Sequence, residues 1–422
     1  MKKQNTRRLN SLSKKVILNG NHAAAHACRQ VRVQVVAAYP ITPQSPVTEK
    51  ISEFVGDGLM NAEYVTVESE HSAITVCIAA STVGARVFTA SSANGLALMH
   101  EQIHWAAGAR LPIVLACVNR AVAAPWNVWT DEQDSISQRD TGWIQVYCED
   151  NQEIYDTIIQ AYKLAEKIYA PVMVCYDGYV LSHTLMPLFI EDQKKIDEFL
   201  PPYKPHTKLD PDDPTAINLV TFPWIRHDPD KPGIERFGGY PEIRFGLQET
   251  LLAVPDEFQK IDDEFGEKFG RKYGIYKEYL CDNAEYIILA LGTLASEAQV
   301  SVDLLRDEGY KVGVLSLKLY RPFPKNQMIN FVKNHDKVKA YAVFDRNLSY
   351  GYEGAVCSDF KAALFTGNVF KPVHNYLAGI GGRDVTYMQI KDAILKTITQ
   401  VEDGKMEKEQ EWINVFIEGA EK

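Results

Sequence analysis

The sequence has no closely spaced cysteines. Its seven cysteines are scattered over 422 residues, and the closest pair is Cys148 and Cys175. Iron–sulfur clusters and structural zinc ions usually need local spacings such as Cys-x-x-Cys. Most of the cysteines lie in apolar stretches, where a thiol serves as a small buried hydrophobic group. We therefore expect no metal site on this chain.

Long apolar runs and dense basic segments are also missing. The longest apolar runs, such as Tyr286–Leu291, are far shorter than the ~20 residues that span a bilayer. The 55 acidic residues outnumber the 45 basic ones, and no basic face of the kind that binds nucleic acid is evident. The basic N-terminus leads into polar residues rather than the apolar core of a secretory signal. We expect a cytoplasmic protein that binds neither a membrane nor nucleic acid.

Short apolar runs alternate with helical patterns in two parts of the chain. Between residues 14 and 190, strand-like runs such as Val33–Ala38 precede helical patterns, among them one continuous helix over 96–107. This alternation is typical of βαβ units in a doubly wound α/β domain. A second α/β pattern begins near residue 281, with a turn expected at Gly292-Thr293. Since a single core rarely exceeds roughly 250–300 residues, the chain should form more than one domain.

Changes in composition indicate where the domains end. A proline- and aspartate-rich stretch follows the first α/β pattern, and a charged helical segment comes after it. The C-terminal residues are charged, with a short apolar patch suited to contact with another subunit. We expect a first domain over 1–245 with an irregular insert near 191–245, a helical connector over 246–280, a second α/β domain over 281–400 and a charged tail over 401–422.

Two segments at predicted strand ends carry side chains that could hold a substrate. In Tyr39-Pro-Ile-Thr-Pro-Gln-Ser-Pro46, three prolines force a non-helical loop directly after a strand, and the Thr42 hydroxyl could face a ligand. Arg120 ends another apolar strand, where a guanidinium can hold a carboxylate through paired hydrogen bonds. Ligands of open parallel sheets bind at these carboxyl ends. The alternatives are a rigid turn at Thr42 and a structural salt bridge at Arg120.

A third stretch, Val67-Glu-Ser-Glu-His-Ser-Ala73, places two carboxylates and an imidazole at the start of a predicted helix. Such groups at a strand end are suited to proton transfer or cofactor binding. A glutamate in the first helical turn is also what the helix dipole favours. The pattern alone leaves both a functional and a purely structural role open for Glu70.

A longer series of motifs occurs in order along the chain. They are Tyr-Pro-Ile-Thr-Pro, Glu-Ser-Glu-His-Ser-Ala, Ala-Asn-Gly-Leu-Ala-Leu-Met-His-Glu, Leu-Pro-Ile-Val, Asn-Arg-Ala, Gln-Arg-Asp-Thr-Gly-Trp, Tyr-Asp-Gly-Tyr, Tyr-Arg-Pro-Phe-Pro, Phe-Asp-Arg-Asn and Gly-Ile-Gly-Gly-Arg-Asp. In this order they resemble the α subunits of the 2-oxoacid:ferredoxin (acceptor) oxidoreductases, closest to the pyruvate type. The resemblance covers roughly residues 14–398.

The resemblance implies a fold and a reaction. The fold is a doubly wound domain of the type that binds the pyrimidine half of thiamine diphosphate, followed by an α/β domain like the C-terminal domain of transketolase. The family uses thiamine diphosphate to decarboxylate a 2-oxoacid oxidatively with coenzyme A, giving acyl-CoA and CO2. The electrons pass to iron–sulfur clusters, with ferredoxin or NAD as the final acceptor.

The resemblance also assigns roles to residues of this chain. Glu70 matches the glutamate that hydrogen-bonds the aminopyrimidine ring of the cofactor and promotes ylide formation, and His71 could join the same network. Thr42 and Arg120 match the residues that hold the oxo and carboxylate groups of the substrate. Trp126 and Trp129 follow Arg120 closely. They either line the pocket for an aromatic 2-oxoacid such as phenylglyoxylate or fill space in the core.

The rest of the thiamine site is expected on another chain. Gly56-Asp57-Gly58 is present, but no Asn-Asn pair follows it at the spacing of a magnesium site, and it comes after a helix rather than a buried strand. The resemblance implies a β-type subunit that carries Mg2+ and 4Fe–4S clusters, a γ-type subunit and a ferredoxin-like subunit. The rival hypotheses are a non-catalytic subunit for assembly or acceptor docking, and a transketolase-like transferase without clusters.

Overall fold

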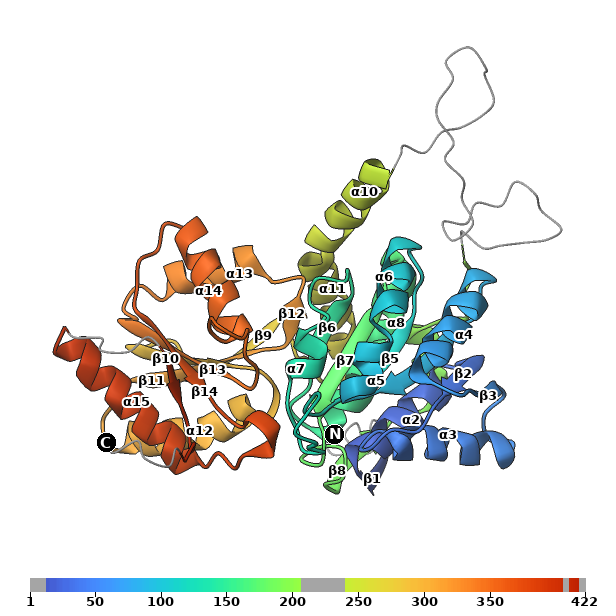
Figure 1. Ribbon diagram of the computed structural model, residues 1–422, viewed down its shortest axis with the longest axis horizontal. Coiled ribbons are helices and arrows are strands. Elements are labelled where there is room, and N and C mark those ends of the chain that lie inside the picture. The colour runs from blue at the N-terminus through green and yellow to red at the C-terminus, as the bar shows by residue number, and fades with distance from the viewer. Residues whose placement is uncertain (1–12, 206–239, 405–409, 417–422) are drawn as a thin grey trace, which may run out of the picture.

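The computed structural model describes residues 13–205, 240–404 and 410–416, which form two α/β units lying side by side (Figure 1). Each unit is built around one mainly parallel sheet flanked by helices. The predicted α/β class with two such units is thereby confirmed. Most of the insert expected near 191–245 falls on residues 206–239, which lie outside the described ranges.

The first unit contains a seven-stranded sheet in the order β12-β6-β7-β5-β4-β2-β3. All its strands are parallel except β12, an edge strand from the later part of the chain that runs antiparallel to β6. The strands are β2 (Val35–Ala38), β3 (Glu63–Thr66), β4 (Val87–Ser91), β5 (Val114–Asn119), β6 (Ile144–Tyr147), β7 (Val172–Asp177) and β12 (Leu319–Arg321). The helices are α2 (Gly20–Gln30), α3 (Ser45–Gly56), α4 (Glu70–Thr82), α5 (Ala93–Leu98), α6 (His100–Gly108), α7 (Gln133–Ile136), α8 (Asn151–Ile168) and α9 (Gln193–Phe199).

Helices cover both faces of this sheet. Strands β5 and β7 are buried along their whole length, which explains their continuous apolar sequences. Alternate residues of these strands enter two different cores, one shared with α2, α3 and α8 and the other with α4 and α6. All seven cysteines are buried, as expected for small hydrophobic side chains.

The connections of the first sheet create a crevice between two neighbouring strands. From β2 the chain passes through α3 to β3, whereas from β4 it passes through α5 and α6 to β5, on the opposite side. The loops at the carboxyl ends of β2 and β4 therefore leave in opposite directions. Ligands of open α/β sheets bind at such a point. The fold thus favours a site beside the loops that follow β2 and β4.

The second unit contains a six-stranded sheet in the order β15-β14-β13-β10-β11-β9, in which only the edge strand β9 is antiparallel. The strands are β9 (Tyr276–Tyr279), β10 (Tyr286–Ala290), β11 (Val312–Leu317), β13 (Ala340–Asp345), β14 (Val373–Leu377) and β15 (Gln410–Trp412). The helices after the first unit are α10 (Tyr240–Leu252), α11 (Val254–Phe269), α12 (Gly292–Asp307), α13 (Lys325–Asn334), α14 (Ala355–Thr366), η1 (Ile380–Gly382) and α15 (Tyr387–Glu402).

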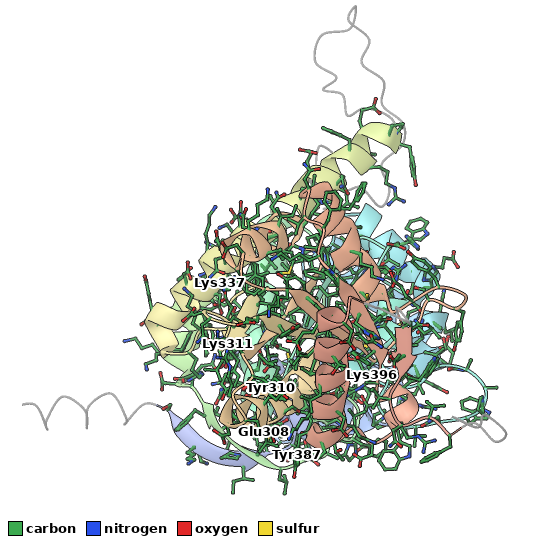
Figure 2. All side chains as sticks on the ribbon, turned by 90° about the vertical axis from the view of Figure 1, so that its left-hand side faces the viewer. Glu308, Tyr310, Lys311, Lys337, Tyr387 and Lys396 are labelled. Carbon is green, nitrogen blue, oxygen red and sulfur yellow. The ribbon has the colours of Figure 1, made fainter. Side chains whose placement is uncertain are left out.

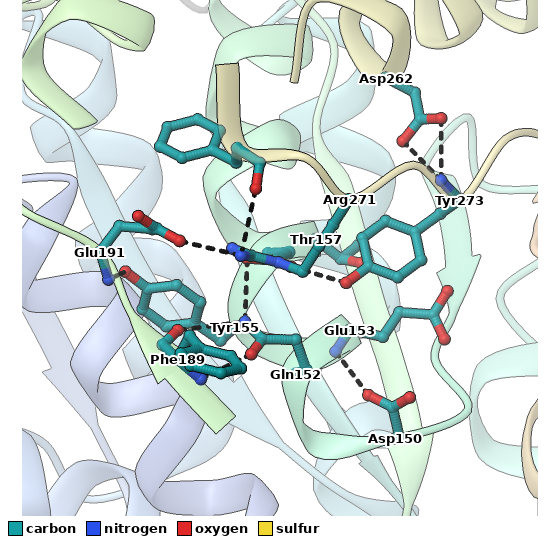
Figure 3. A network of polar contacts seen from close by, with 12 residues as sticks. Asp150, Gln152, Glu153, Tyr155, Thr157, Phe189, Glu191, Asp262, Arg271 and Tyr273 are labelled. Atoms are coloured by element: carbon teal, nitrogen blue, oxygen red, sulfur yellow. Dashed lines mark hydrogen bonds and ion pairs between the residues drawn. The ribbon is translucent and has the colours of Figure 1, made fainter. Parts of the chain in front are cut away.

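The two units are joined by backbone pairing and by buried charges. Next to β12, the ammonium of Lys318 lies 2.5 Å from the Glu153 carboxylate of α8, and both side chains are almost fully buried. On the same helix, Asp156 accepts from the Arg271 guanidinium at 2.6 Å and from the Tyr273 hydroxyl at 2.6 Å. The Arg271 guanidinium also lies 2.9 Å from the Glu191 carboxylate (Figure 3). The segment after α11 is therefore held firmly against the first unit.

The outer side of the second unit is charged. Figure 2 views it from that side, where Glu308, Lys311 and Lys396 project from the surface. Lys311 lies 2.8 Å from Glu285, and Lys396 pairs with Glu411. None of the helices in the described part of the chain is long and apolar enough to cross a membrane.

Two predicted elements differ from the structure. The helix expected over 96–107 is two helices, α5 and α6, that meet at Met99. The turn expected at Gly292-Thr293 is instead the start of α12, where Gly292 has a φ of +51° that glycine tolerates. Strands β1 (Lys14–Leu18) and β8 (Met186–Ile190) lie outside the seven-stranded sheet and form a separate two-stranded antiparallel sheet.

Within the stretch expected to be a helical connector, β9 joins the second sheet. In the expected C-terminal tail, β15 adds to the edge of that sheet beside β14. The limits of the two domains, and the expected contact of the tail with another subunit, stay predictions.

Candidate functional site

The structure brings Thr42, Glu70 and Arg120 to the same edge of the first sheet. Thr42 lies in the loop after β2, Glu70 opens α4 after β3, and Arg120 directly follows β5. Between them lie Ser91 and Ser92, at the end of β4. This edge includes the crevice at which an open parallel sheet binds its ligand.

Arg120 is a buried cation held by neutral partners. Its side chain is 6% exposed, and its guanidinium donates to the backbone carbonyls of Thr42 at 2.8 Å and of Asn127 at 3.1 Å. No carboxylate of the described residues forms an ion pair with it. A buried charge is costly unless it is paired. The alternative of a structural salt bridge is therefore not supported by the described residues, and Arg120 is suited to an anionic ligand.

Two contacts with Pro43 hold the loop that carries Thr42 in place. The buried Asn21 side chain donates to the Pro43 carbonyl at 2.8 Å, and Gly178 packs so closely that a Cβ there would lie 2.9 Å from Pro43 Cγ. The Thr42 carbonyl accepts from Arg120 while its side chain is exposed. The Thr42 hydroxyl forms no hydrogen bond with the described residues and is open to a ligand.

Glu70 is buried, and its carboxylate accepts no hydrogen bond from the residues that the structure describes. It is 7% exposed and contacts the backbone of Gly95 on α5, where a Cβ would lie 2.5 Å from Glu70 Oε1 and 2.7 Å from Ser91 Oγ. The hydroxyls of Ser91 and Ser92 are buried and also lack a hydrogen-bond partner among these residues. Groups in this state usually have a partner in native proteins. The set of one carboxyl and two hydroxyls fits a polar ring such as an aminopyrimidine.

Asp134 on α7 hydrogen-bonds to several of these segments, although no sequence motif indicates a role for it. Its Oδ2 accepts from the backbone N–H of Ala93 at 2.9 Å and of Arg120 at 3.0 Å, and its Oδ1 accepts from Asn119 at 2.7 Å. Burial raises the pKa of Asp134 to about 7, although these donors favour the ionised form. The only sequence signal was its place shortly after Arg120, which does not distinguish it from neighbouring acidic residues.

His71 and Trp126 lie further from this set. His71 follows Glu70 but turns toward α6, where its Nε2 lies 3.2 Å from the Gln102 amide nitrogen and 3.9 Å from Glu101. Trp126 is 78% exposed. Trp129 is also exposed and packs on the ring of Tyr179. Neither tryptophan fills the core of this chain.

Comparison with known proteins defines the class. Residues 26–243 match the family described as the thiamine-diphosphate-binding domain of pyruvate flavodoxin/ferredoxin oxidoreductase, and residues 284–390 match core domain II of pyruvate:ferredoxin oxidoreductase. A 2-oxoglutarate:ferredoxin oxidoreductase from Magnetococcus marinus has the same fold, with a TM-score of 0.65 at 19% identity over 91% of this chain and 65% of that chain. A split-gene transketolase aligns with a TM-score of 0.51 at 13% identity over 90% of this chain and 98% of that chain.

Closer relatives identify the subunit. The chain is 44% identical to the ketoisovalerate oxidoreductase subunit VorA of Pyrococcus horikoshii over 404 residues, covering 95% of this chain and 98% of that relative. It is 43% identical to the pyruvate synthase subunit PorA of Pyrococcus abyssi over 404 residues, with the same coverage. The chain belongs to the α subunits of the 2-oxoacid:ferredoxin oxidoreductases, of the pyruvate or ketoisovalerate type. The predicted family is confirmed, and the protein is part of an oxidoreductase that acts on 2-oxoacids.

Proposed function

We propose that this chain supplies the Arg120, Thr42 and Glu70 side of an active site that a partner subunit completes. The reaction is the oxidative decarboxylation of a small 2-oxoacid with coenzyme A, which yields acyl-CoA and CO2. The observation that carries the proposal is the buried Arg120 guanidinium, whose partners within the described residues are only carbonyl oxygens. A 2-oxoacid brings the carboxylate that this cation lacks.

Arg120 and Thr42 bind the two ends of the 2-oxoacid function. The guanidinium holds the carboxylate through charge-assisted hydrogen bonds. The Thr42 carbonyl is bonded to the same guanidinium, and the exposed Thr42 side chain would hydrogen-bond the neighbouring oxo group. Together they orient the bond that breaks on loss of CO2.

Glu70 serves the cofactor rather than the substrate. Bound thiamine diphosphate supplies the electron sink that makes decarboxylation possible. Glu70 would hold a proton at a ring nitrogen of the aminopyrimidine, and Ser91 and Ser92 would hydrogen-bond its remaining polar atoms. His71 would support Glu70 from the side of α6. The contact with Gly95 fixes the Glu70 carboxyl in the first turn of α4.

The substrate is a 2-oxoacid of the size of pyruvate or 2-oxoisovalerate. Relatives named for each of these substrates are nearly equally similar to the chain, which supports both. An aromatic 2-oxoacid such as phenylglyoxylate is the second candidate. It is favoured by the exposed rings of Trp126 and Trp129 on the loop that begins at Arg120.

The remaining components are assigned to partners. The seven cysteines are dispersed and buried, so we place the 4Fe–4S clusters, and the Mg2+ that holds the diphosphate, on a β-type subunit. A γ-type subunit and a ferredoxin-like subunit would complete the electron path to ferredoxin or NAD. Assembly would take place in the cytoplasm.

The test is a substrate panel on the complex assembled from all its subunits. Pyruvate, 2-oxoisovalerate and phenylglyoxylate are compared for coenzyme A-dependent reduction of an artificial electron acceptor. We expect turnover with one of the two aliphatic acids and a large rise in its KM in Arg120→Lys. Arg32→Lys, an exposed arginine paired with Asp197, is the matched control. Preference for phenylglyoxylate would support the second candidate, and no turnover with any 2-oxoacid would contradict the proposal.

A further inference from the structure

We propose that the second unit positions Arg120 through a glycine-rich turn. The turn comprises residues 379–382 (Gly-Ile-Gly-Gly) after β14, and it holds the loop over 121–132 that backs the guanidinium. The inference rests on the proposed role of Arg120 as the substrate-carboxylate ligand. It assigns Asn127, Gly381 and Gly382 as positioning residues for substrate binding.

Asn127 joins the guanidinium to the turn. Its backbone carbonyl accepts from Arg120 Nε at 3.1 Å, and its side-chain amide donates to the Gly381 carbonyl at 2.8 Å. The Gly381 N–H donates in return to Asp131 Oδ2 at 2.9 Å. The loop is thus bonded to the turn at two points on either side of Trp129. A shift of the turn would move the carbonyl that orients Arg120.

The close approach depends on glycine. Gly381 and Gly382 have φ angles of +62° and +73°, in the left-handed region that L side chains rarely adopt. A Cβ on Gly381 would lie 2.7 Å from the Asn127 amide nitrogen, and one on Gly382 would lie 2.3 Å from the Trp129 Cβ. Any side chain at these positions would push the loop away from the turn.

The turn also packs against the buried side chain of Arg346. At Gly379 a Cβ would lie 2.8 Å from Arg346 Nε, so the turn rests on that buried guanidinium. Arg346 lies 2.7 Å from the carboxylate of Asp177, and its carbonyl accepts from the N–H of Glu132 at 3.0 Å. These contacts leave the turn little freedom to move on its own. The position of the second unit is therefore transmitted to the loop.

The first part of the loop, residues 121–127, has few other supports within the described residues. The Ala123 N–H donates to the Asn94 side chain at 2.8 Å, and the Ala121 N–H donates to the Trp129 carbonyl at 3.1 Å. Trp126 is largely exposed. Among the described residues, Thr130 and Glu132 bond to Asp177 and Arg346, whereas the part of the loop over 121–127 is attached to its surroundings by Asn94 on α5 and by the turn.

The test compares Asn127→Ala and Gly382→Ala with Gly309→Ala in the assembled complex. Gly309 also has a positive φ, of +92°, but a Cβ there would meet no atom within 4 Å, so it reports the effect of backbone strain alone. We expect each of the first two variants to raise the KM of the 2-oxoacid by about tenfold with kcat within about twofold, the size of one lost charge-assisted hydrogen bond. Gly309→Ala should leave both constants unchanged.

A double-mutant cycle separates positioning from general damage. In an Arg120→Ala background, Asn127→Ala should raise the KM no further, because the guanidinium through which it acts is gone. Additive effects in the cycle, or an equal KM rise in Gly309→Ala, would overturn the inference. If Arg120→Ala itself left the KM unchanged, the proposed function would fail instead. Should Gly382→Ala not assemble, Asn127→Ala alone completes the cycle, since this side chain is half-exposed.

Discussion

The carboxyl edges of the two sheets differ in how their polar groups are satisfied. At the first edge, Glu70 accepts no hydrogen bond from the described residues, Ser91 and Ser92 lack partners, and Arg120 has only carbonyl partners. At the second edge, the Asp345 carboxylate accepts four hydrogen bonds, from the backbone of Val356 and Cys357 and the side chains of Asn347 and Asn375.

The second edge is closed by the first unit. Asp177, at the end of β7, lies 2.7 Å from Arg346 and accepts from the hydroxyl of Thr293 at the start of α12. Three atoms there lack a hydrogen-bond partner among the described residues. They are Oε1 of Glu132 and Nε of Arg346, which are buried between the units, and Oε1 of Glu353, which is buried before α14. Both sheets offer the crevice at which α/β folds bind ligands. The pattern of unsatisfied groups, not the fold, therefore distinguishes the site from its support.

Replacing the Glu70 carboxyl group should have the largest effect on turnover. In Glu70→Gln we expect kcat to fall by about 10³–10⁴-fold, the scale of general acid–base catalysis, because an amide cannot exchange a proton with the cofactor ring. Subunit assembly and thermal unfolding should match those of the wild-type complex. Steady-state turnover with the preferred 2-oxoacid measures the effect. Near-normal activity of Glu70→Gln would mean that Glu70 has no catalytic role, and Glu70 would no longer distinguish the first edge from the second.

Breaking the closed edge should affect stability instead. Arg346→Met leaves the Asp177 carboxylate buried without its cation, and we expect the free energy of unfolding to drop by about 3–5 kcal/mol. Adding Asp177→Leu should restore most of the loss, since an apolar pair replaces the charged one. Urea unfolding of the complex compares the two variants. If Arg346→Met were as stable as the wild type, the ion pair of Arg346 and Asp177 would not stabilise this edge.

Arg120 should show the opposite behaviour to Arg346. For Arg120→Lys we expect kcat/KM for the 2-oxoacid to fall by about 10²-fold, because an ammonium cannot replace paired hydrogen bonds to a carboxylate. The free energy of unfolding should change by less than about 1 kcal/mol, since the charge and its carbonyl acceptors are kept. Steady-state kinetics and urea unfolding on the same preparation measure the change in kcat/KM and the change in the free energy of unfolding. Loss of stability with intact kinetics would make Arg120 structural.

The smallest predicted effect concerns pH at the closed edge. Burial raises the pKa of Asp345 from 3.8 to about 6, so between these values the folded chain keeps a proton that the unfolded chain releases. Its contribution to stability is therefore present at low pH and falls as pH rises, by about 1.4 kcal/mol per pH unit. Relative to Asp345→Asn, the wild type should lose stability between pH 4.5 and 6 in urea unfolding. An opposite slope would mean that the four donors outweigh burial.

Much of the fold was predictable because parallel strands buried on both faces have continuous apolar sequences. This holds for β5 and β7. The addition of β12 to the first sheet was not predictable. It pairs with β6 although the two strands are far apart in the sequence, and no local sequence pattern indicates such a pairing. The break at Met99 was missed because no glycine or proline marks it.

The candidate site was predictable where strand ends carry reactive side chains, as at Thr42, Glu70 and Arg120. The supporting residues were not. Asp134 and Asn127 act through contacts with segments distant in sequence, and the burial of Ser91 and Ser92 follows only from the packing of α4 and α5. Periodicity and motif order contain no information on such contacts.

The central claim is that the open side of the Arg120 guanidinium meets the carboxylate of a 2-oxoacid. A structure of the assembled complex with thiamine diphosphate and the preferred 2-oxoacid tests it most directly. We predict that a guanidinium nitrogen of Arg120 lies within hydrogen-bond distance of the substrate carboxylate, about 2.7–2.9 Å, with Glu70 facing the aminopyrimidine ring. An aspartate or glutamate of the partner subunit paired with Arg120, and the substrate bound elsewhere, would contradict the account.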